Sequence, residues 1–226
     1  MAAATTRLKF STAVYIAPAR PLREVAKQVA TAAVVSGDRV SLAVGAGWMR
    51  EEFELMGQDF SNRGKRLDEM IVALRELWRG GWVSWSGQYF QVPEFMIEPH
   101  PEAPVPILCG GESEAALRRA ARLCDGWVGS VYSWDDAVHF VARLNALRRE
   151  YGRDNEPFGL SLGILEPASV DLFKRAEDLG VTALLCSPWA LAGDMVAGAH
   201  DGFKLDAGRY RAPIEEFADT ILSKFH

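Results

Sequence analysis

The chain has 226 residues, of which 49% are hydrophobic and 24% are charged, and this composition is typical of a soluble globular protein with a sizeable core. The formal net charge of −5 argues against a nucleic-acid-binding protein, and no apolar run is long enough to span a bilayer. The amino terminus lacks a secretion signal and the three cysteines are far apart, which favours a cytoplasmic protein with reduced thiols over a disulfide framework or a metal site.

Apolar periodicity predicts strands that alternate with helices along the chain. We expect strands at residues 8–16, 40–44, 107–109, 127–129, 160–165 and 183–186. We expect helices at residues 22–35, 63–78, 113–123, 135–151, 170–179 and 214–225. One segment breaks the alternation, because aromatic runs at 82–85 and 89–92 flank Ser86-Gly87-Gln88 and predict a β-hairpin. With the proline-rich stretch that follows, this insertion covers about residues 81–104.

Strict alternation of strands and helices predicts a parallel sheet covered by helices, and therefore the α/β class. The sequence has no GxGxxG motif to mark an open dinucleotide-binding sheet, so we expect a TIM (β/α)8-type barrel. A closed barrel needs eight such units, and the chain supplies six. We therefore expect residues 1–226 to form a single barrel domain that lacks the first two β/α units.

The segment after Pro106 has the pattern of an anion site. A short apolar strand runs through Gly110 and Gly111 onto a helix that Ser113 opens. Glycines allow backbone N–H groups to approach a ligand, and the first turn of a helix leaves its N–H groups unpaired, so phosphate is the usual occupant. An ordinary strand-to-helix connection also favours glycine and a serine cap, which leaves both interpretations open. Arg118 and Arg119, about a turn further on, either add positive charge or form solvated surface.

Further candidate residues are weaker, and each has an ordinary structural alternative. Trp48, at the end of the strand at 40–44, either lines a pocket or packs in the core. Cys109 has no histidine beside it in sequence and is better interpreted as a small buried residue than as a nucleophile. The long loop around His200 lies where barrels place the loops that cover an active site. The remaining candidates, expected to be structural or weakly involved, are His100, His139, Ser130 and Ser133.

Several motifs, in order along the chain, resemble one family. They are residues 7–14, 26–31, 36–40, 43–48, 51–53 and 63–69, the hairpin residues Val83, Gly87, Tyr89 and Phe90, and residues 110–127. These motifs are similar to those of the luciferase-like flavin monooxygenases, and in particular to the branch of oxidoreductases that use coenzyme F420, a deazaflavin. The resemblance is strong from Arg7 to Trp127 and weaker beyond.

The resemblance implies a barrel that binds its cofactor across the carboxyl ends of the strands and dimerises through outer helices. It implies an oxidoreductase that transfers hydride to or from a small organic substrate, or oxygenates it, with coenzyme F420 as the cofactor and FMN as the alternative. In this family a strand bulge, often with a non-proline cis peptide, supports the cofactor ring. The matching ring residues are Thr12, Ala13 and Val14, and the matching tail residues are Gly45, Ala46, Gly47, Cys109, Gly110, Gly111, Glu112 and Ser113.

The sequence departs from the family pattern in two places. Ala46 stands where some flavin-binding relatives have an arginine, and this favours the deazaflavin. The segments that carry acid–base residues in relatives have no counterpart, so no catalytic residue is assigned. Two other interpretations remain open, namely a non-catalytic or truncated relative that dimerises without cofactor, and a cofactor-free barrel enzyme that acts on a phosphorylated metabolite at the same glycine turn.

Overall fold

The structure, a computed structural model, describes residues 1–187 and 207–225. The chain divides into two compact units, each of which is described by itself. The first comprises residues 1–129 and 142–159, and the second comprises residues 130–141 and 160–226. The single barrel domain that lacks the first two β/α units therefore remains a prediction.

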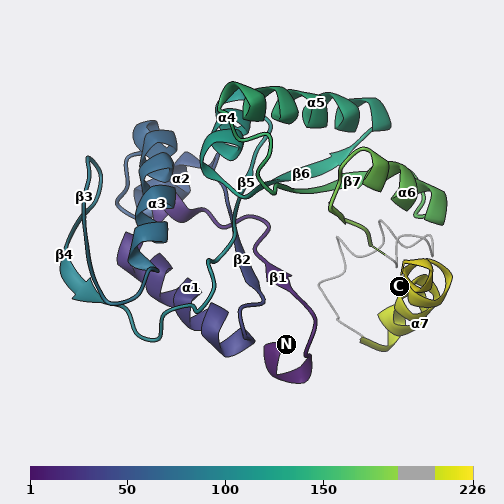
Figure 1. The fold of residues 1–226 in the computed structure, drawn as a ribbon, viewed down its shortest axis with the longest axis horizontal. Helices are drawn as coiled ribbons and strands as arrows, with labels where there is room; N and C mark the ends of the chain where they lie inside the picture. The colour runs from purple at the N-terminus through teal and green to yellow at the C-terminus, as the bar shows by residue number, and fades with distance from the viewer. Residues whose placement is uncertain (188–206, 226) are drawn as a thin grey trace. The chain divides into compact units, whose positions relative to one another are not determined.

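The first unit is built on parallel strands in the order β1-β2-β5-β6. The helices that follow these strands include α1 and α3, which lie side by side on one side of β2 (Figure 1). This arrangement confirms the predicted alternation and the α/β class. The elements are β1 (Phe10–Ser11), α1 (Leu22–Ser36), β2 (Val40–Val44), α2 (Arg50–Leu55), α3 (Arg63–Leu77), β5 (Ile107–Gly110), α4 (Glu114–Leu123) and β6 (Gly126–Tyr132).

The core of this unit lies between the sheet and its helices. Large side chains of the strands, such as Leu42, Ile107 and Trp127, are almost completely buried, and in β2 three consecutive residues are buried, as expected for a sheet covered on both faces. Helix α3 covers them with a stripe of apolar residues at helical spacing, which includes Leu67 and Leu74. The predicted core face of α3 is therefore confirmed.

Strand β1 is much shorter than the predicted strand at 8–16. Backbone pairing with β2 stops at Ser11 and returns only as an isolated bridge between Tyr15 and Val44. Between these points the side chain of Thr12 replaces the backbone, because its Oγ1 donates to the carbonyl of Ala43 at 2.7 Å and accepts from the Ala43 N–H at 2.9 Å. The apolar, β-branched sequence signalled an extended segment but not this interruption of the ladder.

The inserted segment forms the predicted hairpin from β3 (Trp82–Ser86) and β4 (Gln91–Met96), which lies on the far side of α3 from β2 (Figure 1). The second strand continues through Pro93 to Met96, beyond the predicted end at Val92. A proline is tolerated there because the pairing of β3 with β4 shifts register between Val83 and Trp85, opposite Pro93.

The carboxylate of Glu69, on α3, holds the turn of this hairpin. It accepts hydrogen bonds from the backbone N–H groups of Gln88, Tyr89 and Phe90, each at 2.9 Å, and from Nε1 of Trp85 at 3.1 Å. A side chain at Gly87 would collide with this carboxylate, which explains the glycine in the turn. Residues 69 and 87 therefore fix the insertion to the helix.

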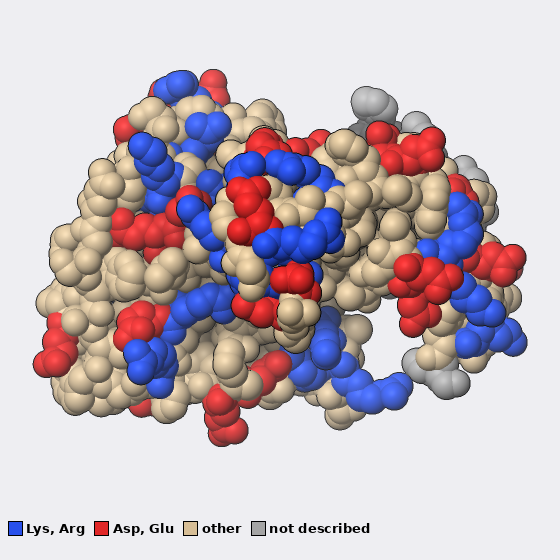
Figure 2. Space-filling model, turned by 45° about the horizontal axis from the view of Figure 1, so that its top comes forward, with Lys and Arg blue, Asp and Glu red and all other residues tan. Residues whose placement is uncertain are grey.

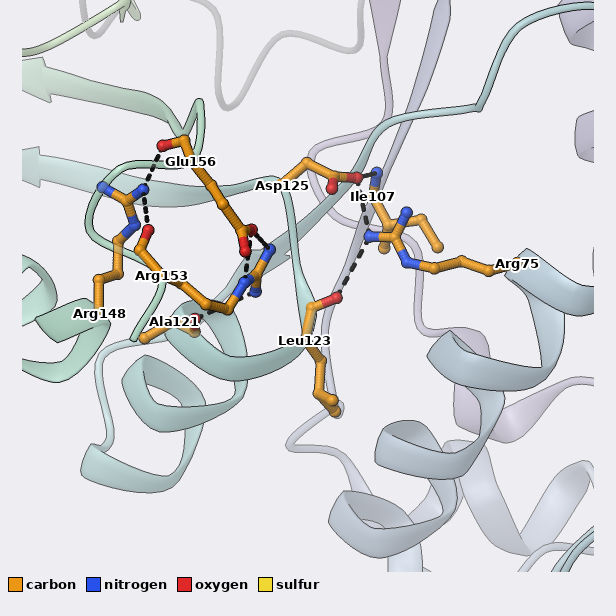
Figure 3. A network of polar contacts seen from close by, with 8 residues as sticks. All are labelled: Arg75, Ile107, Ala121, Leu123, Asp125, Arg148, Arg153 and Glu156. Atoms are coloured by element: carbon orange, nitrogen blue, oxygen red, sulfur yellow. Dashed lines mark hydrogen bonds and ion pairs between the residues drawn. The ribbon is translucent and has the colours of Figure 1, made fainter. Parts of the chain in front are cut away.

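The carboxyl end of α4 is held by two arginines (Figure 3). Arg75, on α3, donates to the Leu123 carbonyl at 3.2 Å and to the Asp125 carboxylate at 2.8 Å. Arg153 donates to the Ala121 carbonyl at 3.1 Å. Basic side chains at this end satisfy carbonyls that have no partner within the helix. The opposite end of α4 is left to face a cavity, which is described below.

The short helix α2 (Arg50–Leu55) was missed by the sequence analysis. Only Phe53 of its six residues is buried, so the segment carries no periodic apolar stripe.

The second unit contains the end of β6, followed by β7 (Gly159–Ile164) and β8 (Ala183–Leu184), with β7 and β8 pairing in parallel. Its helices include α6 (Val170–Asp178) and α7 (Ala207–Thr220), and α5 (Trp134–Glu150) spans both units. Helix α7 begins at Ala207, before the expected start at Ile214, and it contains Pro213. No helix in the described ranges is long and apolar enough to cross a membrane.

Candidate functional site

Val14 lies where the ends of three strands of the first unit meet. The Ala13–Val14 peptide bond is cis, as the resemblance implied for this segment. A Cβ atom added at Gly45 would lie 2.7 Å from Cγ2 of Val14, and one added at Gly110 would lie 2.7 Å from Cγ1. Glycine at the ends of both β2 and β5 therefore makes room for the Val14 side chain between them.

A cavity of about 480 Å³ opens beside Val14. This volume lies within the range of small-molecule and cofactor sites. Seven of the residues that the sequence analysis assigned to a cofactor line it, and they come from three separate strand ends. These residues are Val14, Gly45, Ala46, Gly47, Gly110, Gly111 and Ser113.

Four other assigned residues do not line the cavity. Thr12 is engaged by Ala43 through both of its Oγ1 hydrogen bonds, and Cys109 is fully buried toward the core. Ala13 and Glu112 are exposed. Their contribution to cofactor binding remains a prediction.

The amino end of α4 contributes one wall of the cavity. Ser113 caps this helix, because its Oγ accepts a hydrogen bond from the Ala116 N–H at 3.3 Å. Gly111 adopts a positive φ of 112°, which an L-residue rarely takes, and its carbonyl accepts from Nε1 of Trp127 at 2.9 Å. The glycine turn is thus held in one conformation, with the start of the helix directed at the cavity.

The amino end of α3 contributes a second wall, which the sequence analysis did not assign to the site. Ser61, Arg63, Gly64 and Lys65 line the cavity there. Arg63 donates to the Gly47 carbonyl at 3.0 Å and so ties α3 to the turn after β2. The first turn of α3 holds no acidic residue, and its N-cap Asn62 makes no side-chain capping bond.

The lining of the cavity is cationic. It includes Arg63, Lys65 and Arg119, and it includes no aspartate or glutamate. Basic residues in the first turn of a helix are unfavourable beside the positive end of the helix dipole. A bound anion would relieve this repulsion, so the geometry favours a negatively charged group at this wall.

Arg118 and Arg119 have different environments. Arg119 lines the cavity, whereas Arg118 pairs with Glu114 and Glu150 at 2.8 Å on the outer side of α4. Figure 2 shows basic and acidic side chains intermixed on the face of the molecule in view. The surface interpretation is confirmed for Arg118 only.

The remaining candidates are placed as follows. Trp48 is 81% exposed and lines the cavity, so core packing was the wrong alternative. His100 packs against Gly80 and lies 3.3 Å from Glu98, outside the cavity lining. A hydrogen bond that Cys124 donates to Cys109, together with burial, raises the pKa of the Cys124 thiol, and Cys109 itself is fully buried outside the cavity lining.

Four candidates belong to the second unit or to undescribed residues, and the first of them, Ser130, is an exposed residue of β6. Ser133 caps α5 through the Asp136 N–H, and His139 is exposed on the same helix. The loop around His200 lies outside the described residues. In the described ranges, no cluster of three or more His, Cys, Asp or Glu side chains is placed to hold a metal ion.

The comparisons with known proteins identify the family. The model of the luciferase-like monooxygenase family matches residues 1–171, and the chain therefore belongs to this family. An uncharacterized protein of Mycobacterium tuberculosis strain H37Rv is 42% identical over 185 residues, which cover 82% of this chain and 64% of the relative. Pyrimidine monooxygenase RutA of Allorhizobium ampelinum is 28% identical over 174 residues, covering 70% of this chain and 47% of RutA. The chain thus spans about half to two thirds of the length of these relatives.

Solved structures show the same fold. An F420-dependent secondary alcohol dehydrogenase in complex with an F420–acetone adduct matches with a TM-score of 0.62 at 23% identity, covering 79% of this chain and 56% of that chain. DmoA from Hyphomicrobium sulfonivorans matches with a TM-score of 0.64 at 19% identity, covering 79% of this chain and 45% of that chain. These matches extend the family assignment to the three-dimensional arrangement of the strands and helices.

Proposed function

We propose that the chain is a cofactor-dependent oxidoreductase that binds a flavin or deazaflavin in the cavity beside Val14. The observation that carries the proposal is the lining itself. One part is apolar, with Val14, Ile16 and Trp48, and another is cationic and polar, with the amino ends of α3 and α4. A flat apolar ring with an anionic tail matches this division.

The residues present fit such a group. Gly45 and Gly110 make room for the Val14 side chain over the strand ends, where it can lie beneath a flat ring. Val14 supports the ring, and Trp48 supplies an exposed aromatic face at the rim. Ser113 and Lys65 stand at the two helix ends, where phosphate oxygens find donors and positive charge.

Coenzyme F420 is our first choice of cofactor, with FMN as the alternative. F420 supplies hydride transfer when bound, whereas FMN also supports monooxygenation. Ala46 lines the cavity without adding a charge, in keeping with the deazaflavin branch of the family. The dehydrogenase that shares the fold is described as F420-dependent, which adds support from a related architecture.

The protein's own contribution is binding and orientation. The helix ends hold the tail, Val14 and the glycines set the plane of the ring, and Trp48 limits access of water on one side. No side chain is assigned to proton transfer. We further propose a small organic substrate and a homodimer, and sedimentation of a stable monomer would contradict the dimer.

Titration of the purified chain with F420 and with FMN tests the proposal. Both cofactors fluoresce, so stacking against Trp48 in the cavity is expected to quench them in a saturable way. Quenching that saturates at micromolar concentration for either one supports the proposal. Absence of binding of both at high micromolar concentration contradicts it and favours a non-catalytic relative.

A further inference from the structure

Arg119 joins the two helix ends that face the cavity. Its side chain is only 7% exposed, although it lies on α4 next to Arg118, which is half-buried. The guanidinium Nε pairs with the Asp68 carboxylate, and Nη2 donates to the Gly64 carbonyl at 3.1 Å. A single buried cation on α4 therefore contacts two groups on α3.

The two groups on α3 are spaced to suit one guanidinium. Gly64 and Asp68 are four residues apart, so they lie one turn apart on the same face of the helix. A Cβ atom at Gly64 would lie 3.1 Å from Nη2 of Arg119, which is tighter than an ordinary contact. The absence of a side chain at Gly64 lets the arginine reach the first turn of α3.

The guanidinium of Arg119 already has an anionic partner, which it shares with Arg122. Asp68 faces it directly, and Asp68 also accepts from Arg122 at 2.9 Å. Lys65, in contrast, is exposed at the same wall and forms no ion pair within the described part of the chain. Arg119 is therefore suited to fixing geometry, and Lys65 is suited to meeting the ligand.

We propose that Arg119 is a positioning residue that sets the spacing between the amino ends of α3 and α4, so that one phosphate group contacts both. The inference rests on the proposed function and names a residue that acts through Gly64 and Asp68 rather than on the cofactor. Loss of the guanidinium lets α3 move away from α4, and small displacements of this kind weaken charge-assisted hydrogen bonds.

The test compares ligands with and without the phosphate. FMN and riboflavin share one ring system and differ in the terminal phosphate, so the ratio of their dissociation constants measures recognition of the phosphate alone. If the wild-type chain prefers the deazaflavin, F420 and its tail-free 8-hydroxy-5-deazariboflavin core serve as the pair. Fluorescence titrations are made on the wild-type chain, Arg119→Gln, Arg119→Lys and Asp68→Asn, with Arg118→Gln as the matched control.

We expect Arg119→Gln to lower the preference for the phosphorylated ligand about tenfold, a change in affinity typical of one lost charge-assisted contact. Arg119→Lys restores part of the preference, because a point charge reaches one of the two partners. Asp68→Asn lowers the preference by a smaller factor, and Arg118→Gln leaves it unchanged.

General loss of structure gives a different result, because it weakens the binding of both ligands by the same factor and leaves the ratio of their dissociation constants unchanged. An unchanged ratio in Arg119→Gln, or an equal fall in Arg118→Gln, overturns the inference. If circular dichroism shows that Arg119→Gln does not fold, Arg119→Lys and Asp68→Asn decide by the same criterion. If the wild-type chain binds none of these four ligands, the proposed function itself is overturned.

Discussion

The side chain of Val14 fills the space that a side chain at position 110 needs. A Cβ atom on Gly110 would lie 2.7 Å from Cγ1 of Val14, well inside van der Waals contact. The two residues are 96 positions apart in sequence (110 − 14), and their packing brings the end of β5 against the segment after β1. This contact determines the floor of the cavity and leads to the first prediction.

Gly110→Ala is expected to destabilise the protein by about 1–3 kcal/mol, the usual cost of inserting a methyl group into a packed site. Val14→Ala alone costs about 1 kcal/mol for the lost methyl groups. The double variant is expected to be more stable than the sum of the two costs indicates, since truncation of Val14 removes the collision. Urea denaturation of all four proteins gives the coupling energy, and additive costs would contradict the contact.

Ser113→Ala separates the role of the α4 cap in stability from its role in binding. Loss of the capping hydroxyl is expected to cost about 0.5–2 kcal/mol of stability. Ser169, which caps α6 by accepting from the Leu172 N–H at 3.1 Å, offers a matched control in the second unit. We expect both variants to lower Tm, but only Ser113→Ala to weaken binding of a phosphorylated cofactor, about threefold to tenfold. Equal affinities of the two variants for the cofactor would show that Ser113 is not part of the binding site.

Lys65→Glu places a negative charge at the wall where the anionic tail is proposed to bind. Repulsion is expected to weaken binding at least fivefold at low ionic strength, and the difference from wild type is expected to shrink as salt is added. Lys174→Glu, at an exposed position on α6, serves as the control and is expected to bind as the wild type does. The same loss in both variants would point to a nonspecific effect of net charge.

Glu69 gives the hairpin a predictable response to acid. Burial raises the pKa of this carboxyl, but the hydrogen bonds from Tyr89, Trp85, Phe90 and Gln88 together lower the pKa below its ordinary value of 4.5. A lowered pKa in the folded state means that the stabilisation is present above about pH 4.5 and is lost as pH falls below it.

Comparison of the wild type with Glu69→Gln isolates this contribution from that of other carboxylates. At neutral pH we expect the variant to be less stable by about 1–3 kcal/mol, since an amide cannot accept all four bonds. The difference between the two proteins is expected to narrow as pH falls below about 4.5 and through the lowered pKa of the folded state. Urea unfolding at each pH measures it, and a constant difference would exclude titration of Glu69 as the cause.

The sequence was sufficient to predict the strands, helices and glycine turns that build one side of the cavity. Gly110 could be assigned because a strand that runs through glycine onto a serine-capped helix is typical of an anion site, whereas Gly45 was assigned from the resemblance to the family. Arg63 and Lys65 could not, because basic residues at the start of a helix usually form solvated surface. The absence of an acidic residue from the first turn of α3 was the one feature of the sequence that indicated an anion site at this helix end.

Other features depended on contacts between distant segments. The interruption of β1 follows from hydrogen bonds between Thr12 and Ala43, which local propensity does not encode. The different environments of Arg118 and Arg119 follow from the position of α3 relative to α4. Two adjacent residues of the same type are indistinguishable until this packing is known.

The central claim is that the cavity beside Val14 binds the cofactor through the amino ends of α3 and α4. Backbone amide spectra of the isotope-labelled chain, recorded during titration with F420 or FMN, test it most directly. The claim predicts saturable shifts at Gly64, Lys65, Gly111 and Ser113, with Gly152 and Gly180 unchanged. Shifts confined to another part of the surface, such as the groove between α1 and β4 lined by Lys27 and Met96, would contradict it.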